Sequence, residues 1–311
     1  MSEVTLSSWR AWRSAIHRAL PALCIAIASF TIAPPAKAAT AQAGPAAALR
    51  ARHAALAAAL DRSPFGQRLL LESIESPHAL QGDIYAVVDY ALPGVTSVVT
   101  SPQRWCDALI LHPNVKYCRP RSRADGAALS VAIGRKVDQP LEDAYRVEFA
   151  FTTAASATDY VAADLRADKG PLGTTGYQIT LEAVALESGR SFVHLRYSYQ
   201  FGLEARLAME AYLATGGREK VGFTRADAAG EREPKYIGGL RAALERNTMR
   251  YYLAIDACLA TLGAPPAQRF EQSLEHWYAS SERYARQLHD VDRPAYIAMK
   301  RREYARQQAA D

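Results

Sequence analysis

Several signatures of catalytic chemistry are missing from this sequence. No histidine lies in an HExxH or HxH pattern, no Gly-x-Ser-x-Gly nucleophile elbow occurs, and the glycine-rich stretch 169–176 lacks the residue order of a phosphate-binding loop. We therefore expect no metal ion, no cofactor and no catalytic residue set. The sequence favours a binding protein over an enzyme.

A strong charge excess is also missing, as is a second long apolar run. The formal net charge is +5 for 311 residues, and Arg10, Arg13, Arg18 and Lys37 contribute much of it. We expect no nucleic-acid partner, because binding to phosphates requires a concentrated basic surface. After position 38 no apolar stretch reaches the roughly 20 residues that span a bilayer. The apolar content of 49 % predicts a globular protein with a sizeable core.

The first forty residues have the pattern of a secretory signal peptide. A basic start containing Arg10, Arg13 and Arg18 precedes an uncharged apolar run over residues 19–32. The small residues of Ala36-Lys37-Ala38 then form a site that signal peptidase can cut. We expect cleavage near Ala38 and a periplasmic location. An uncleaved N-terminal anchor or a buried helix is the alternative.

Cysteine is scarce, and only Cys106, Cys118 and Cys258 follow the predicted cleavage site. Cys106 and Cys118 lie at the two ends of one short connection, and an oxidising compartment favours their pairing. Such a disulfide would stabilise the fold by about 3 kcal/mol on the chain-entropy model. Two buried free thiols are the alternative. Cys258 lies in an apolar helical run and is expected to be a core residue.

Alternation of apolar and polar residues predicts an antiparallel sheet in the middle of the chain. The alternation is clearest over residues 129–133, 145–151, 179–185 and 193–201, and strand-like segments at 69–73 and 84–92 precede it. In the last hairpin we expect a three-residue loop that places Leu181 opposite Tyr197 and Glu182 opposite Arg196. The polar face of the sheet, which includes His194, is expected to face solvent.

Segments with helical periodicity precede and follow the strands of this sheet in the chain. We expect helices over residues 46–61, over one or two segments between 95 and 111 with a start at Ser101-Pro102, and over 203–215. A long amphipathic helix is expected over 236–262, ended by Gly263 and the Pro265-Pro266 pair. A helical tail follows over 263–311.

This order of elements resembles the START and polyketide-cyclase-like (SRPBCC, helix-grip) superfamily, here as an exported bacterial member. Residues 84–89 match its first strand, 93–105 the following helix, and 236–262 the long closing helix. The resemblance implies an α+β fold in which a curved antiparallel sheet wraps a long C-terminal helix, with extra N- and C-terminal helices. It divides the chain into a signal peptide (1–38), an N-terminal helix and first strand (39–81), a helix-grip domain (82–262) and a helical tail (263–311).

Members of that superfamily bind apolar molecules between sheet and helix, so the resemblance implies a carrier of a lipid or another hydrophobic molecule. The candidate ligand-binding residues are inner-face side chains of the sheet and residues of the facing helix: Tyr145, Phe149, Phe151, Leu181, Leu195, Tyr197, Tyr199, Tyr251 and Ile255. The alternative is that these rings simply fill the core. A cyclase or dehydratase using Tyr197 or Tyr199 would need a carboxylate or histidine beside those tyrosines.

The helical tail is a further candidate site. Residues 283–306 contain seven basic and three acidic residues, with Tyr284, Tyr296 and Tyr304 interleaved. This composition suits transient contact with anionic lipid headgroups. The alternatives are that Trp277 and Tyr284 pack the tail onto the domain, or that the tail binds a partner in envelope assembly. His112, between the two paired cysteines, is expected to be a surface-loop residue.

Overall fold

The computed structural model describes residues 44–309 except residues 125, 157, 217–219 and 227–233. The predicted signal peptide lies outside the described residues, so cleavage near Ala38 and the periplasmic location stay predictions. Within the described ranges, no helix has both the length and the apolar character needed to cross a membrane.

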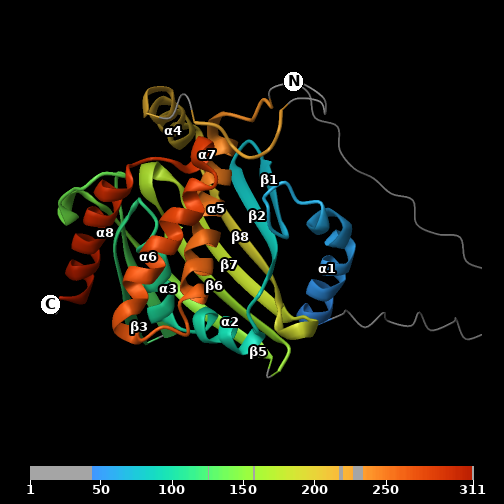
Figure 1. The fold of residues 1–311 in the computed structure, drawn as a ribbon. Coiled ribbons are helices and arrows are strands. Elements are labelled where there is room, and N and C mark those ends of the chain that lie inside the picture. The colour runs from blue at the N-terminus through green and yellow to red at the C-terminus, as the bar shows by residue number, and fades with distance from the viewer. Residues whose placement is uncertain (1–43, 125, 157, 217–219, 227–233, 310–311) are drawn as a thin grey trace, which may run out of the picture. The chain divides into compact units, whose positions relative to one another are not determined.

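Eight strands form one antiparallel sheet (Figure 1). In spatial order they are β1 (Leu69–Glu75), β2 (Ala79–Val88), β8 (Ser191–Gln200), β7 (Thr175–Ala185), β6 (Tyr160–Lys169), β5 (Tyr145–Ser156), β4 (Gly126–Ile133) and β3 (Val115–Arg123). The strands from β3 to β8 are a simple meander, and the β1–β2 hairpin adds to β8. The predicted sheet is confirmed, and β3 and β6 are strands that the sequence analysis did not name.

Helices cover both faces of this sheet. The inner face carries α2 (Leu92–Val99), α3 (Pro102–Leu109) and α5 (Gly239–Ala260), and α5 contacts β1, β2 and β8. The helix α1 (Pro45–Asp61) packs on the outer face against β1 and β7. The remaining elements are α4 (Leu203–Gly216), α6 (Pro266–Glu282), α7 (Ala285–Leu288), α8 (Arg293–Gln308) and the 3₁₀ turns η1 (Leu141–Asp143), η2 (Pro171–Gly173) and η3 (Glu187–Gly189). The α+β helix-grip fold class is confirmed.

The long helix α5 is buried on more sides than an amphipathic pattern predicts. Leu244 and Leu253 are fully buried, as the apolar stripe requires, but so is Glu245. The reason is that β1 and the segment around Phe223 and Thr224 cover this part of α5, while α6 packs along α5 farther on. Glu245 is satisfied by Ser73, by the Thr224 hydroxyl and by the backbone amides of Phe223 and Thr224, at 2.5–2.9 Å.

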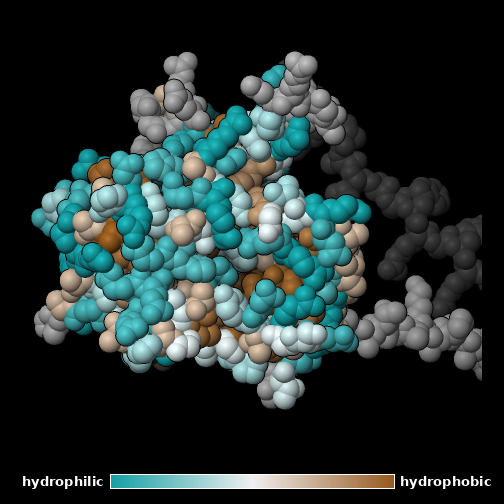
Figure 2. Space-filling model, viewed as in Figure 1, coloured by the Kyte–Doolittle hydropathy of each residue, from teal (hydrophilic) through white to brown (hydrophobic). Residues whose placement is uncertain are grey.

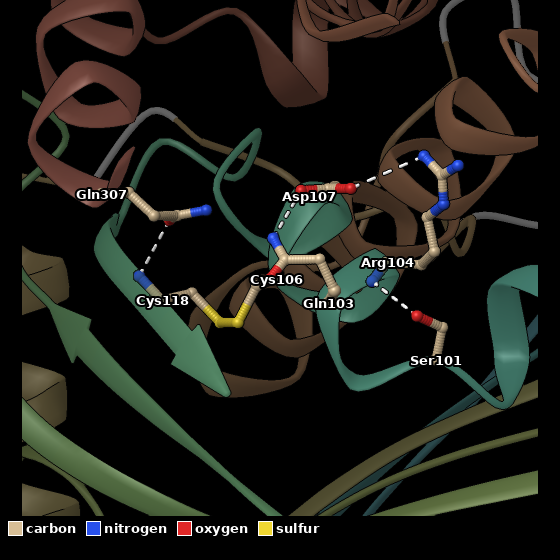
Figure 3. The surroundings of a disulfide bond; sticks show 7 residues. All are labelled: Ser101, Gln103, Arg104, Cys106, Asp107, Cys118 and Gln307. Carbon is tan, nitrogen blue, oxygen red and sulfur yellow. Dashed lines mark hydrogen bonds and ion pairs between the residues drawn. A yellow bond between two sulfur atoms is a disulfide. The ribbon is translucent and has the colours of Figure 1, made fainter. Parts of the chain in front are cut away.

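The predicted disulfide between Cys106 and Cys118 is present (Figure 3). It joins α3 to the edge strand β3, with 5.1 Å between the two Cα atoms. Gln307 of α8 accepts a hydrogen bond from the Cys118 amide at 3.0 Å, so α8 also holds this edge. Cys258 is a buried free thiol, as expected, and burial raises its pKa to about 12.

The predicted register of the β7–β8 hairpin is wrong by two residues. Leu181 lies opposite Leu195, and Glu182 lies opposite His194 instead of Arg196. The loop has three residues, as expected, but it is η3, one position earlier in the chain. Ser188 and Gly189 both have positive φ and complete the turn inside η3, so the chain re-enters the sheet at Arg190. A shift of two residues leaves every side chain on its predicted face.

The outer face of the sheet is less exposed to solvent than the sequence predicts, because α1 covers part of it. His194 is only 7 % exposed. Its Nδ1 lies 2.8 Å from Glu182 Oε1 and its Nε2 lies 2.7 Å from Asp83 Oδ1. The Tyr85 ring stacks on the imidazole at 4.4 Å, and Arg52 of α1 lies over Tyr85. The expectation of a solvated His194 is therefore wrong.

We expect this arrangement to make stability depend on pH. Burial alone would lower the pKa of His194, but its bonds to Asp83 and Glu182 outweigh that effect and raise it. A raised pKa means that the stabilising charge is fully present below about pH 6.5 and is lost as pH rises through the folded-state pKa. Asp83 and Glu182 have lowered pKa values, so their contributions are lost only in acid.

The test is urea unfolding of the wild type and His194→Gln between pH 5 and pH 9. The difference in free energy of unfolding should be largest at pH 5–6 and shrink toward pH 9. His276→Gln is the matched control, because His276 pairs with Asp256 but is about one-third exposed. A pH-independent difference for His194→Gln would contradict the expectation.

The helical tail packs into the same core as the sheet. Trp277 of α6 stacks on Tyr296 of α8 at 4.9 Å, both rings are buried, and Tyr284 packs on the core from between α6 and α7. Packing through Trp277 and Tyr284, one of the alternatives, is therefore confirmed. Several basic tail residues are paired at the protein surface: Arg293 with Glu275, Arg301 with Glu271, and Arg302 with Asp138. Contact of the tail with a lipid surface stays a prediction.

A buried ion cluster fastens α8 to β3. Glu303 accepts from the Lys116 ammonium at 2.9 Å and from the Lys300 ammonium at 2.6 Å, and all three side chains are fully buried. Lys300 also donates to the carbonyls of His112 and Val115, both at 2.8 Å. The charged cluster thus orders the chain between the two paired cysteines.

Candidate ligand site between the sheet and the long helix

The structure brings most of the predicted ligand-binding residues to the inner face. Eight of them are buried or half-buried there: Phe149, Phe151, Leu181, Leu195, Tyr197, Tyr199, Tyr251 and Ile255. Tyr145 is different, since it lies at the start of β5 and is 42 % exposed. Among the described residues no ring contact joins Phe149 or Phe151 to the tyrosines, so the predicted set divides into two groups.

Four tyrosines form one contact cluster, which we call the tyrosine quartet: Tyr177, Tyr197, Tyr199 and Tyr251. Tyr197 and Tyr199 come from β8, and their ring centroids are 5.6 Å apart. Tyr251 of α5 packs edge-on against Tyr197 at 5.1 Å, and Tyr177 of β7 stacks on Tyr199 at 5.1 Å. Tyr177 was missed by the sequence analysis, although it precedes Ile179 by two residues and therefore shares its face.

The hydroxyls of the quartet are incompletely paired. Thr174 donates to the Tyr177 hydroxyl at 2.9 Å, and the Tyr197 hydroxyl lies beside that of Tyr177. The hydroxyls of Tyr199 and Tyr251 make no hydrogen bond within the part of the chain that the structure describes. Neither oxygen is among the described buried side-chain atoms that lack a partner, so both hydroxyls are accessible to water. Water or a ligand group can bind there.

Burial keeps these phenols protonated. It raises the pKa of Tyr197, Tyr199 and Tyr251 well above the usual value of 10. At neutral pH each hydroxyl can donate one hydrogen bond and accept others. The quartet thus offers neutral hydrogen-bonding groups, not phenolate nucleophiles.

His112 lies at one end of the quartet, which corrects the expectation of a surface loop. Its ring stacks on Tyr251 at 4.8 Å and is only 2 % exposed, because the tail helices cover its loop. The Asn114 amide donates to His112 Nδ1 at 3.1 Å, so the neutral ring carries its proton on Nε2. Asn247 lies nearby, but Nε2 has no partner with acceptable hydrogen-bond geometry. Burial, with the positive charges of Arg250, Lys136 and Lys300, holds the pKa of His112 well below its usual value.

The two best-defined hollows lie elsewhere. One, of about 10 Å³, is lined by residues of α6 and α8 and has room for about one water. The other is a surface groove of about 400 Å³ between residues 138–140 and α8. Between the sheet and α5 the rings contact one another, which agrees with the alternative that the aromatic residues fill the core.

The helix α4 lies beyond one end of the sheet, at the top of the view in Figure 1. It packs on η2 and α5, and it buries Ala205 and Met209 in the common core. Its outer side carries Leu203 and Leu207, which are 69 % and 56 % exposed, close to the exposed Leu172 of η2. By contrast, the face seen in Figure 2 is largely hydrophilic, with small separate hydrophobic patches.

Comparisons with known proteins concern the fold alone. No family model matches the chain, and no curated protein matches it. Among solved structures it is similar to norcoclaurine synthase from Thalictrum flavum, with 15 % identity over 47 % of this chain and 89 % of that chain (TM-score 0.31). It is also similar to a protein from Arthrobacter aurescens (15 % identity, 60 % and 91 % covered, TM-score 0.31) and to the lipid transfer domain of human StarD13 (7 % identity, 52 % and 88 % covered, TM-score 0.29).

The chain has a START-like helix-grip fold. This assignment rests on the strand order of the sheet and on the packing of α5 against β1, β2 and β8. No residue role comes to this chain from the similar structures. The candidate site therefore rests on the quartet and on His112.

Proposed function

We propose that this protein binds an apolar small molecule, such as a lipid, between the sheet and α5, with the tyrosine quartet at the polar end of the site. The unpartnered hydroxyls of Tyr199 and Tyr251 carry the proposal. Phenylalanine would fill the same space, whereas these hydroxyls add hydrogen-bonding groups that water or a ligand can reach. Side chains that only filled the core would not need those oxygens.

The site opens by displacement of α4. This helix contacts few other elements, and segments with few buried contacts open at low cost in free energy. Ala205 and Met209 would leave the core during opening, and the ligand would replace their apolar contacts. A carrier has to open in this way to take up and release its cargo.

The predicted export signal supports a periplasmic location for this carrier, and the disulfide suits an oxidising compartment. The basic residues of the tail would then provide transient contact with an anionic membrane surface during exchange. Neither part of this role is needed for ligand binding itself.

A covalent lock on α4 tests the proposal. A Cβ built on Gly173 would lie 3.6 Å from the Ala205 Cβ, a separation that a disulfide can bridge. We expect the oxidised Gly173→Cys/Ala205→Cys variant to lose at least tenfold of its affinity for a fluorescent fatty alcohol. Reduction should restore binding, and the wild type with the same reductant is the control. Equal binding by the locked and reduced forms would contradict entry under α4, and no saturable binding by the wild type would contradict the proposed function.

A second candidate function, a cyclase or dehydratase, is favoured by one observation, the stacking of His112 on Tyr251. The Asn114 amide occupies His112 Nδ1, so Nε2 can donate to a substrate carbonyl but cannot remove a proton. His112 would polarise a bound carbonyl, and a general base would have to come from another group. A carbonyl-containing ligand that is released chemically unchanged after long incubation would speak against this candidate.

A further inference from the structure

We propose that the polar end of the bound molecule is an uncharged oxygen, a hydroxyl or a carbonyl, and not a carboxylate, phosphate or ammonium group. This inference rests on the proposed function and specifies the ligand class of the same site. The juxtaposition that carries it is four tyrosines from three elements that meet where the described charged groups acting on Tyr199 and Tyr251 are already paired.

The hydroxyls converge from β7, β8 and α5. The ring centroid of Tyr197 lies 6.2 Å from that of Tyr177, 5.6 Å from that of Tyr199 and 5.1 Å from that of Tyr251. Thr174 already binds the Tyr177 hydroxyl, so the hydroxyls left to bind a ligand are those of Tyr199 on β8 and Tyr251 on α5. Two neutral groups that both donate and accept suit a ligand hydroxyl, and their O–H groups suit a carbonyl.

The charged groups closest to these hydroxyls are already paired. Glu75 acts on Tyr199, but it pairs with Arg206 at 3.4 Å. Arg250 acts on Tyr251, and its guanidinium binds Asp290 at 2.6 Å. His112 remains neutral at this end of the quartet. An ionised ligand group would lose its hydration here without gaining an opposite charge, which is costly in a low-dielectric core.

The surroundings of the quartet are apolar and would hold the rest of the ligand. Leu181 and Leu195 of the sheet and Ile255 of α5 are all buried in the same core as the tyrosines. A molecule with one neutral oxygen and an otherwise apolar body therefore matches both parts of the site.

Competition binding with a series of equal chain length tests the inference. The probes are hexadecanol, methyl palmitate, palmitate at pH 8 and hexadecylamine at pH 7, each competing with a fluorescent fatty alcohol. We expect the alcohol and the ester to bind about tenfold more tightly than the two charged probes, which corresponds to about one hydrogen bond. Palmitate or hexadecylamine binding as tightly as the alcohol would overturn the inference while leaving the proposed function intact.

A double variant and a control variant test whether the tyrosine quartet causes the preference for an uncharged ligand. In Tyr199→Phe/Tyr251→Phe the preference for alcohol over acid should fall from about tenfold to below threefold. The control is Tyr304→Phe, whose ring stacks on Phe270 of α6 and should leave the preference unchanged. A full preference in the double variant would overturn the inference. If none of the four probes competes in the wild type, the proposed function fails as well.

Discussion

Replacing Glu303 with glutamine is expected to lower the free energy of unfolding by about 3–5 kcal/mol. The substitution keeps the shape of the side chain but removes the one carboxylate that Lys116 and Lys300 share, and all three groups are fully buried. Removing one partner of a buried ion pair leaves an uncompensated charge in a low-dielectric interior. Chemical denaturation of the wild type and Glu303→Gln at pH 7 measures the loss.

Arg302→Gln is the matched control on the same helix. Arg302 pairs with Asp138 at 2.8 Å, but both side chains are more than half exposed, so the loss should be below about 1 kcal/mol. The pH dependence separates charge from packing. Burial already lowers the pKa of Lys300 to about 8, so the cost of Glu303→Gln should shrink as pH rises and the lysines lose their charge. A loss that is small at pH 7, or unchanged at pH 10, would contradict this account.

Removing the disulfide is expected to lower the free energy of unfolding by about 3 kcal/mol. Cys106 and Cys118 close a loop over a sequence separation of 12, and the bond joins α3 to the edge strand β3. The double variant Cys106→Ala/Cys118→Ala removes the bond and leaves the buried thiol of Cys258 in place. Denaturant unfolding with and without a reductant measures the effect.

The reductant provides the control for this prediction. Wild-type protein should lose a similar amount of stability when reduced, whereas the double variant should not respond. If oxidised and reduced wild type unfold at the same denaturant concentration, the disulfide does not stabilise the fold as expected.

The sequence predicted the inner face of the site well and its polar end poorly. Tyr197, Tyr199 and Tyr251 follow from strand alternation and from the apolar stripe of the long helix, which are local patterns. Tyr177 lies on the same face, but the glycine-rich turn before it hid the start of β7. His112 could not be found this way, because its burial comes from Lys300 and the tail helices, about 190 positions later in the chain.

On the outer face of the sheet, too, the local pattern was predicted correctly and the contacts with distant segments were not. The alternation in β7 and β8 placed Glu182 and His194 on one side of the sheet, and they do lie there. What covers that side was not visible in the alternation, because α1 comes from more than a hundred residues earlier and buries Phe192 and Val184 under its own leucines. The face of the sheet that was predicted to be exposed to solvent therefore contains a second, smaller hydrophobic core.

Element order, the disulfide and the helix start at Ser101 followed from residues close together in the sequence, because period, turn chemistry and short loop closure are local properties. The fold class followed from the resemblance of that element order to the helix-grip superfamily. The hairpin register, the burial of His112 and His194, and the ion cluster around Glu303 depended on which distant segments packed together. Tertiary packing decided them, because burial and charge pairing are set by neighbours in space and leave no periodic trace in the chain.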